Sequence, residues 1–255
     1  MKKGKRLGNY KKGYPEKQNI VDIFSGNWFC RFPKESNLVS GGNATAFEDE
    51  RISWAEDKLG AFCGQKILEL GPLEGGHSFM LWKKKAKEII SIEADDNAFL
   101  KCLCVKEIFE MKNVTFLNGD FREYLRGNSN NGFDSVIASG VLYHMKNPVE
   151  LLDLISKVTD RLYIWTHFYN EEIIENIESY SNKFSPIQNA KYKDFYFEYA
   201  TWSYNEWLGT NEFCGGLEEQ SKWMTKKSIL NCLEYLGFSN IAVDFEDNYH
   251  INGPS

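Results

Sequence analysis

A glycine-rich turn after a short apolar stretch is the first feature of this sequence that could do chemistry. Residues 66–70 read Lys-Ile-Leu-Glu-Leu and are followed by Gly71, Pro72, Leu73, Glu74, Gly75 and Gly76. Such a turn lets ligand atoms approach the backbone closely. A dinucleotide-binding loop requires glycine where Leu73 stands, and the carboxylate of Glu69 would repel a pyrophosphate. The turn therefore predicts a ligand without a pyrophosphate, whose positively charged amino group would face Glu69.

Two further carboxylates follow later apolar stretches. Glu93 ends residues 88–93 and stands 24 positions after Glu69, which is the separation of one strand-helix-strand step. Its carboxylate could accept hydrogen bonds from two ribose hydroxyls, although acids at strand ends also serve as helix caps. Asp120 follows residues 114–117, where it could accept from an adenine amino group while Phe121 covers the ring. The two acids together predict that the ligand contains a nucleoside.

Polar and titratable side chains also follow the next two apolar stretches. Ser139 stands directly after residues 133–138, and ligands of open α/β sheets bind at the carboxyl ends of the strands. His144 lies six residues beyond Ala138, and His167 lies one residue beyond residues 161–166. Both histidines are candidates for a general base, and we expect His144 to reach deeper into the crevice. The alternative is that each is a hydrogen-bonded structural histidine.

The elements that must position these residues alternate between short apolar runs and longer amphipathic stretches. A first helix is expected to begin near Ala44. Strands are expected at residues 66–70, 88–93, 114–117, 133–138 and 161–166, with helices at residues 78–87, 96–111 and 148–158 and after Asp120. This alternation indicates a doubly wound α/β fold with a mainly parallel, Rossmann-like sheet flanked by helices. Thr225 should cap a last helix that stops at Gly237, before a strand at residues 241–245.

Two segments fall outside this alternation. Residues 1–44 are polar and weakly periodic, and we expect them to be a leader that packs on a domain formed by residues 45–255. Residues 167–222 form an insertion after the fifth strand that is crowded with aromatic side chains. Aromatic residues dominate the energetics of cores and interfaces. The sequence therefore leaves two roles open for the insertion: a lid over an acceptor, or a packed subdomain or dimer surface.

In this order, the turn, the acids at positions 93 and 120, and residues 133–144 resemble the class I (Rossmann-like) S-adenosylmethionine-dependent methyltransferase family. The resemblance covers residues 45–168 and the chain after Met224. It implies that the amino-acid part of S-adenosylmethionine is held by Glu69, Gly71 and Gly75, the ribose by Glu93 and the adenine by Asp120. Residues 140–148 and 225–238 look most like a subgroup with tRNA wobble-uridine modifying enzymes and methyltransferases of glycans and natural products. The chain departs from the family at Leu73, where a third glycine is usual, and in the final antiparallel hairpin, which is not visible.

Composition narrows the function classes further. The formal net charge is −6, and the insertion carries few basic residues, whereas phosphate binding relies on clustered lysine and arginine. A nucleic-acid partner is therefore disfavoured. Six cysteines occur without a Cys-x-x-Cys pair, so no metal site is expected. No apolar segment could serve as a signal peptide or a membrane span, which favours a cytoplasmic protein without a membrane partner.

The function predicted from these observations is O-methylation of a small molecule or glycan with S-adenosylmethionine as donor. Methyl transfer from a sulfonium is dominated by positioning, and a hydroxyl acceptor also needs its proton removed. The alternatives are a tRNA wobble-uridine modifying transferase and a donor-binding module without catalysis. A homodimer is left open. The missing glycine pattern disfavours a nicotinamide oxidoreductase.

Overall fold

The computed structural model describes residues 10–129, 132–177, 180, 183–204, 218–250 and 252–255. Its centre is a five-stranded sheet with strand order β3-β2-β1-β4-β5, in which every pairing is parallel. The strands are β1 (Lys66–Leu70), β2 (Glu88–Glu93), β3 (Val114–Asn118), β4 (Ser135–Ser139) and β5 (Leu162–Trp165). The strand order reverses between β1 and β4, which is where ligands bind in such sheets. The predicted doubly wound, parallel α/β fold is confirmed.

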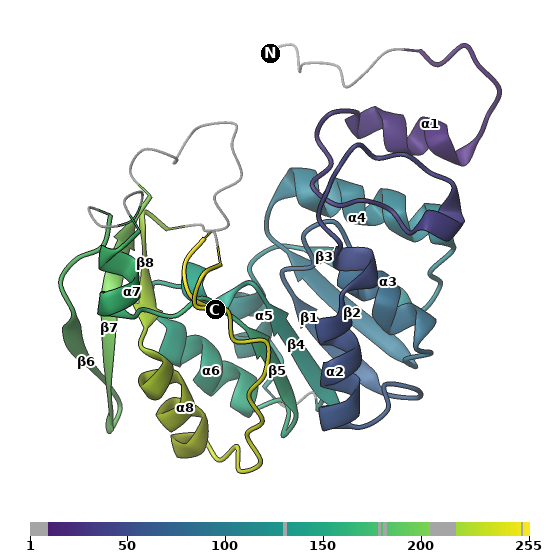
Figure 1. Cartoon of the computed structure of the whole chain (residues 1–255). Helices are drawn as coiled ribbons and strands as arrows, with labels where there is room; N and C mark the ends of the chain where they lie inside the picture. The colour runs from purple at the N-terminus through teal and green to yellow at the C-terminus, as the bar shows by residue number, and fades with distance from the viewer. Residues whose placement is uncertain (1–9, 130–131, 178–179, 181–182, 205–217, 251) are drawn as a thin grey trace, which may run out of the picture.

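Helices cover both faces of this sheet (Figure 1). The described α-helices are α1 (Lys17–Val21), α2 (Glu50–Leu59), α3 (Gly76–Lys83), α4 (Asp96–Phe109), α5 (Phe121–Gly127), α6 (Pro148–Ser156), α7 (Glu171–Glu175) and α8 (Lys226–Tyr235). Of these, α1 lies on α4, and α7 packs beside the second sheet. None of the described helices has the length and apolar character needed to cross a membrane. Thr225 caps α8 by accepting a hydrogen bond from the backbone N–H of Ser228, as the sequence predicted.

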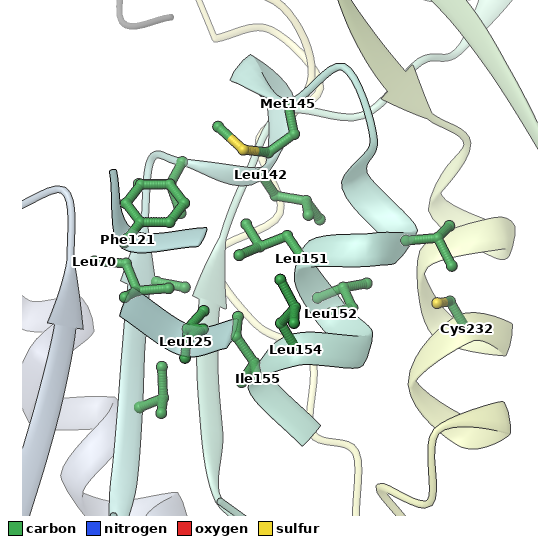
Figure 2. Close-up of a cluster of buried hydrophobic side chains, with 14 of the residues drawn as sticks. Leu70, Phe121, Leu125, Leu142, Met145, Leu151, Leu152, Leu154, Ile155 and Cys232 are labelled. Atoms are coloured by element: carbon green, nitrogen blue, oxygen red, sulfur yellow. The ribbon is translucent and has the colours of Figure 1, made fainter. Parts of the chain in front are cut away.

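Each face of the sheet has its own apolar core. Leu68 and Val136 pack with residues of α5 and α6, while Ile67 and Ile137 pack on the opposite face with residues of α2, α3 and α4. Figure 2 shows the first cluster, in which Leu125 of α5 lies beside the leucines of α6. Successive residues of a strand point to opposite faces. The runs of β1 and β4 are mainly apolar because both of their faces are buried, with Glu69 as the buried polar exception in β1.

The aromatic insertion folds into a second, antiparallel sheet with strand order β6-β7-β8. Its strands are β6 (Gln188–Tyr192), β7 (Phe195–Ser203) and β8 (Gln220–Met224). Phe195, Phe197 and Tyr199 of β7 pack in the same core as α8. The backbone N–H of Lys222 in β8 donates to the carbonyl of Met145 (2.9 Å), which joins this sheet to the loop after β4. Part of the aromatic content therefore has a packing role.

Two expected elements differ from the structure. A short helix, α1, already lies at Lys17–Val21, before the first helix that the sequence predicted. The helix expected near Ala44 is α2, which begins at Glu50 because the carboxylate of Asp49 caps it by accepting from the N–H of Arg51. The strand expected at residues 241–245 is absent. Residues 241–247 form neither helix nor strand. Phe245 adopts a left-handed φ of 55°, which breaks the extended alternation, and it packs on Trp54 with ring centroids 6.0 Å apart.

Candidate active site

A cavity of about 1090 Å³ opens at the carboxyl ends of the parallel strands. Seven of the nine residues that the sequence predicted for the site line it: Gly71, Glu93, Asp120, Phe121, Ser139, His144 and His167. We call the part beside Glu93 and Asp120 the acidic end. The aromatic end is the part walled by Tyr143, Trp165, Trp202 and Trp223, with histidines 144, 167 and 250.

The glycine turn contains three residues with a left-handed φ, namely Gly71, Leu73 and Gly75. Gly71 has a φ of 66°, and a Cβ there would lie 2.6 Å from Cγ1 of Val141. Leu73 itself adopts a left-handed φ of 56°, which is costly for a side chain of this kind. Its backbone N–H donates to Oε2 of Glu93 (3.0 Å). The turn is thus held in place by the carboxylate at the tip of β2.

Glu69 and Gly75 lie behind the cavity wall and not on it. Glu69 is 2% exposed, and its Oε2 accepts hydrogen bonds from the hydroxyls of Ser78 and Ser91, the latter at 2.7 Å. Burial raises the pKa of this carboxyl. Gly75 has a φ of 79° and packs on Phe116 at the start of α3. In this structure both residues support the turn from behind, so direct ligand contact by either stays a prediction.

Two carboxylates shape the acidic end. Glu93 is buried, and its two oxygens accept from the N–H groups of Leu73 and Asp95, both at 3.0 Å. Burial raises the pKa of Glu93. Asp120 caps α5 and also binds the Arg122 guanidinium, at 2.7 Å for the shortest contact. Burial acts to raise the pKa of Asp120, but the hydrogen bonds from Arg122 outweigh it and lower this pKa. A carboxylate oxygen has two acceptor sites, so acceptor capacity remains on Glu93 for hydroxyl groups.

The sequence did not predict a charged cluster beside the turn. Asp49 binds Nε and Nη2 of Arg51 and also Nε2 of His77 (2.9 Å). Burial acts to raise the pKa of Asp49, but the hydrogen bonds from His77 and Arg51 outweigh it and hold this pKa well below its usual range. The guanidinium of Arg51 stacks on Trp165, 4.5 Å from the ring centroid. Asp49, Arg51 and His77 all line the cavity between its two ends.

A buried ion pair between Glu74 and Lys101 anchors the leader at the cavity wall. Glu74 is 1% exposed and accepts from the N–H groups of Phe29 and Cys30 and from Nζ of Lys101 (2.7 Å). Lys101 also donates to the carbonyl of Asn27. Asn27 and Phe29 line the cavity. The position of this wall therefore depends on the pairing of Glu74 with Lys101.

Histidines and large aromatic rings form the aromatic end. Nδ1 of His144 lies 2.8 Å from the hydroxyl of Tyr204, and burial followed by the proximity of His167 lowers the pKa of His144 to about 3. His167 is 2% exposed and stacks on Trp223 with ring centroids 5.1 Å apart. Burial, followed by the proximity of His250, lowers the pKa of His167 to about 4. Both imidazoles are therefore neutral at physiological pH and able to accept a proton.

Sequence reasoning missed His250 and Trp223, and it gave Tyr204 no role beyond the aromatic insertion. The crowding of aromatic residues was the signal for Tyr204, whereas Trp223 lies one residue beyond the predicted insertion and meets Trp202 only through the antiparallel pairing of β7 with β8. No sequence signal marked His250, because it enters the wall only when the chain after α8 returns to the sheet. Within the described ranges, no group of three histidine, cysteine, aspartate or glutamate side chains could hold a metal ion.

Comparison with known proteins agrees with this geometry. The family model described as a methyltransferase domain matches residues 62–226, well over half of the chain. The N-terminal domain of EvdMO1 with SAH bound superposes with a TM-score of 0.67 at 22% identity, covering 90% of this chain and 89% of that one. The same domain in the presence of SAH and D-fucose gives the same values.

A more distant structure shares the fold. The S-adenosylmethionine-dependent methyltransferase from Mesorhizobium loti has a TM-score of 0.53 at 12% identity, covering 78% of this chain and 86% of that one. The curated proteins contain no match. The acidic end, with two carboxylates and a glycine turn at the strand tips, suits a nucleoside joined to an amino acid. The chain belongs to the methyltransferase-domain family and is an S-adenosylmethionine-dependent methyltransferase.

Proposed function

We propose that this methyltransferase transfers a methyl group to a hydroxyl of a small, sugar-like acceptor. The observation that carries the proposal is the division of one cavity into an acidic end and an aromatic end that contains neutral histidines. The first suits the methyl donor and the second an uncharged, polar acceptor. A single cavity allows donor and acceptor to meet without leaving the protein.

The acidic end fits S-adenosylmethionine by its chemistry. Glu93 would hold the ribose hydroxyls, and Asp120 would accept from the adenine amino group, with Phe121 beside the ring. Ser139 and the backbone of Gly71 would border the amino-acid part. When bound, the donor supplies a methyl group on a positively charged sulfur, and transfer leaves a neutral thioether. The chain's task is therefore to orient the acceptor and to take its proton.

The charges of the wall favour an uncharged acceptor. Three lysine or arginine residues belong to the described wall, and each is paired: Arg51 with Asp49, Lys101 with Glu74, and Arg122 with Asp120. An RNA or phosphorylated acceptor would need free cations. Trp202 and Trp223 instead line the wall with apolar ring surface, against which the C–H groups of a sugar can pack. The solved EvdMO1 domain in the presence of D-fucose supports a sugar acceptor by analogy.

The insertion has a direct part in this proposal. Tyr180, Trp202 and Tyr204 belong to it and line the cavity. It would cover the acceptor and exclude water, while other aromatic residues of the same sheet pack in the core. A neutral histidine at the aromatic end would then act as general base, which is worth on the order of 10²–10⁴ in rate.

Labelled S-adenosylmethionine incubated with a panel of acceptors tests the proposal. The panel contains D-fucose and other monosaccharides, an amino sugar that carries a primary amine, catechol, and bulk tRNA. We expect label in the monosaccharide fraction as a methyl ether. Label in the tRNA fraction would overturn the acceptor class. Tight donor binding by calorimetry without transfer to any acceptor would favour a donor-binding module.

A further inference from the structure

The chain that returns after α8 is built into the aromatic end of the cavity. Figure 1 shows this yellow segment ending between the two sheets. The carbonyl of Pro254 accepts from the backbone N–H of Phe168 (3.0 Å) and lies 3.3 Å from Nδ1 of His167. Gly253 has a φ of 99°, and a Cβ there would lie 2.8 Å from Trp223. The close fit against Trp223 and the two contacts of Pro254 fix the segment's position.

This contact assigns the proton of His167. A carbonyl oxygen only accepts hydrogen bonds, so Nδ1 of His167 must carry hydrogen. The neutral ring then has its lone pair on Nε2. Nδ1 makes the contact with the Pro254 carbonyl, and the Gly253 backbone lies against the same ring. Nε2 is therefore the proton-accepting atom that His167 can offer to a ligand.

His250 has the opposite arrangement. Its Nδ1 accepts from the backbone N–H of Asn252 (3.1 Å), so the neutral ring carries its hydrogen on Nε2. The rings of His167 and His250 are 5.0 Å apart between centroids, and both line the cavity. His167 thus offers a hydrogen-bond acceptor, its Nε2 lone pair, and His250 offers a hydrogen-bond donor, its Nε2–H.

We propose that His167 and His250 hold the acceptor hydroxyl between them, and that His250 is a catalytic residue of this enzyme. The inference rests on the proposed hydroxyl acceptor. The hydroxyl donates to Nε2 of His167 and accepts from Nε2–H of His250, which leaves one lone pair on the oxygen for the methyl group. In the reaction this pair forms the new O–CH₃ bond, the CH₃–S bond breaks with its electrons on sulfur, and the hydroxyl proton goes to Nε2 of His167.

The same pairing selects the acceptor atom. A neutral primary amine has a single lone pair. If His250 donates to that lone pair, none is left for the methyl group. A hydroxyl has two lone pairs and satisfies both histidines while keeping one free. The pair of opposite tautomers therefore favours an oxygen acceptor over a nitrogen acceptor.

Nitrogen-15 NMR of the histidine rings tests the assignment without any acceptor. In the wild-type protein near neutral pH, we expect hydrogen on Nδ1 of His167 and on Nε2 of His250. Spectra of His167→Gln and His250→Gln assign the two signals. The same tautomer on both rings, or a protonated imidazolium at either, would overturn the proposal.

Kinetics of two variants test whether the N–H group of His250 acts as a hydrogen-bond donor to the acceptor hydroxyl. His250→Phe removes the N–H, whereas His250→Gln keeps an N–H donor at a similar reach. With D-fucose, or whichever panel acceptor is methylated, we expect kcat/KM to fall about tenfold in the Phe variant. The Gln variant should retain most activity, and calorimetry should show the same Kd for S-adenosylmethionine in both. Equal activity of the Phe variant and wild type, or equal loss in both variants with a lowered Tm, would overturn the proposal.

The outcomes separate the two proposals. If the wild-type protein methylates nothing in the panel, the proposed function fails, while the NMR spectra still decide whether the rings are complementary. If the wild type methylates an amine in preference to a hydroxyl, the pairing of His167 with His250 is wrong even though methyl transfer stands.

Discussion

Replacing Glu93 by alanine should weaken the binding of S-adenosylmethionine by about 2–3 kcal/mol, or about 30- to 150-fold in Kd. Each carboxylate oxygen already accepts one backbone N–H, from Leu73 or from Asp95. Each keeps a second acceptor site for one ribose hydroxyl. Two hydrogen bonds to a charged group are therefore lost on substitution, at about 1–1.5 kcal/mol each.

Glu93→Gln is the matched control, because it keeps the shape of the side chain but not its charge. The amide nitrogen of Gln donates hydrogen bonds and cannot accept one, so at least one contact with a backbone N–H group or a ribose hydroxyl is lost. We therefore expect an intermediate loss of about tenfold in the affinity for S-adenosylmethionine. The carboxylate is the form that binds. Because burial raises the pKa of Glu93, donor affinity should fall as the pH is lowered through that raised value. The Gln variant should lack this acid limb.

Calorimetric titration with S-adenosylmethionine and with its demethylated product measures these effects, and Tm shows whether each variant is folded. Asp120→Ala should have the smaller effect, because a single adenine contact is expected and Arg122 already engages this carboxylate. Unchanged affinity in folded Glu93→Ala would refute the assignment of the acidic end. A larger loss at Asp120 than at Glu93 would mean that their roles are exchanged.

Three further predictions concern the base, the pH dependence of stability and the leader. His167→Asn should lower kcat by about 10², the low end of the range for a general base, at constant donor affinity, because its lowered pKa makes it a weak base. His144→Asn should lower kcat by less, although the sequence favoured His144, because Nδ1 of His144 already contacts the Tyr204 hydroxyl; full activity of folded His167→Asn would eliminate it as the base. Since the pKa of His167 is about 4 in the folded chain and 6.5 as a free side chain, the unfolded chain binds more protons between these values. Stability in urea should therefore fall by about 2 kcal/mol from about pH 7.5 to about pH 5 through this residue; an equal slope in His167→Asn would contradict this. Lys101→Met leaves Glu74 buried without its counter-charge and should cost about 3 kcal/mol in the free energy of unfolding. Adding Glu74→Gln should recover part of that loss, and strictly additive losses in a double-mutant cycle would argue against the pairing.

The sequence predicted the central sheet closely. The observed bounds of β1 and β2 match residues 66–70 and 88–93, because a strand buried on both faces reads as a mainly apolar run. Each run here has one polar residue inside it, Glu69 or Ser91. The same reasoning failed at residues 241–245. There the apolar alternation was present, but pairing depends on a neighbour that the local sequence does not reveal. The start of α2 was missed because the capping role of Asp49 was not recognised.

The candidate site divides along the same line. The acids at the tips of β2 and β3 were predicted because their place follows from strand order and chain direction alone. The contact of Glu74 with Phe29 and Lys101 was not, since it joins residues 45 and 27 positions away along the chain. The pairing of His167 with Pro254 spans 87 positions. Such contacts depend on tertiary packing, which no local pattern encodes.

The two ends of the cavity should differ in how readily their residues can be substituted. The acidic end is built on strand tips of the central sheet, where a change of position would disturb the core. The aromatic end combines Tyr143 and Trp165, which come from the side of the central sheet, with Trp202 and His250, which come from the insertion and the returning segment. Loops carried on a rigid scaffold can change without loss of the fold. Substitutions at Trp202 or His250 should therefore alter acceptor choice and rate while the Kd for S-adenosylmethionine stays within about twofold of wild type.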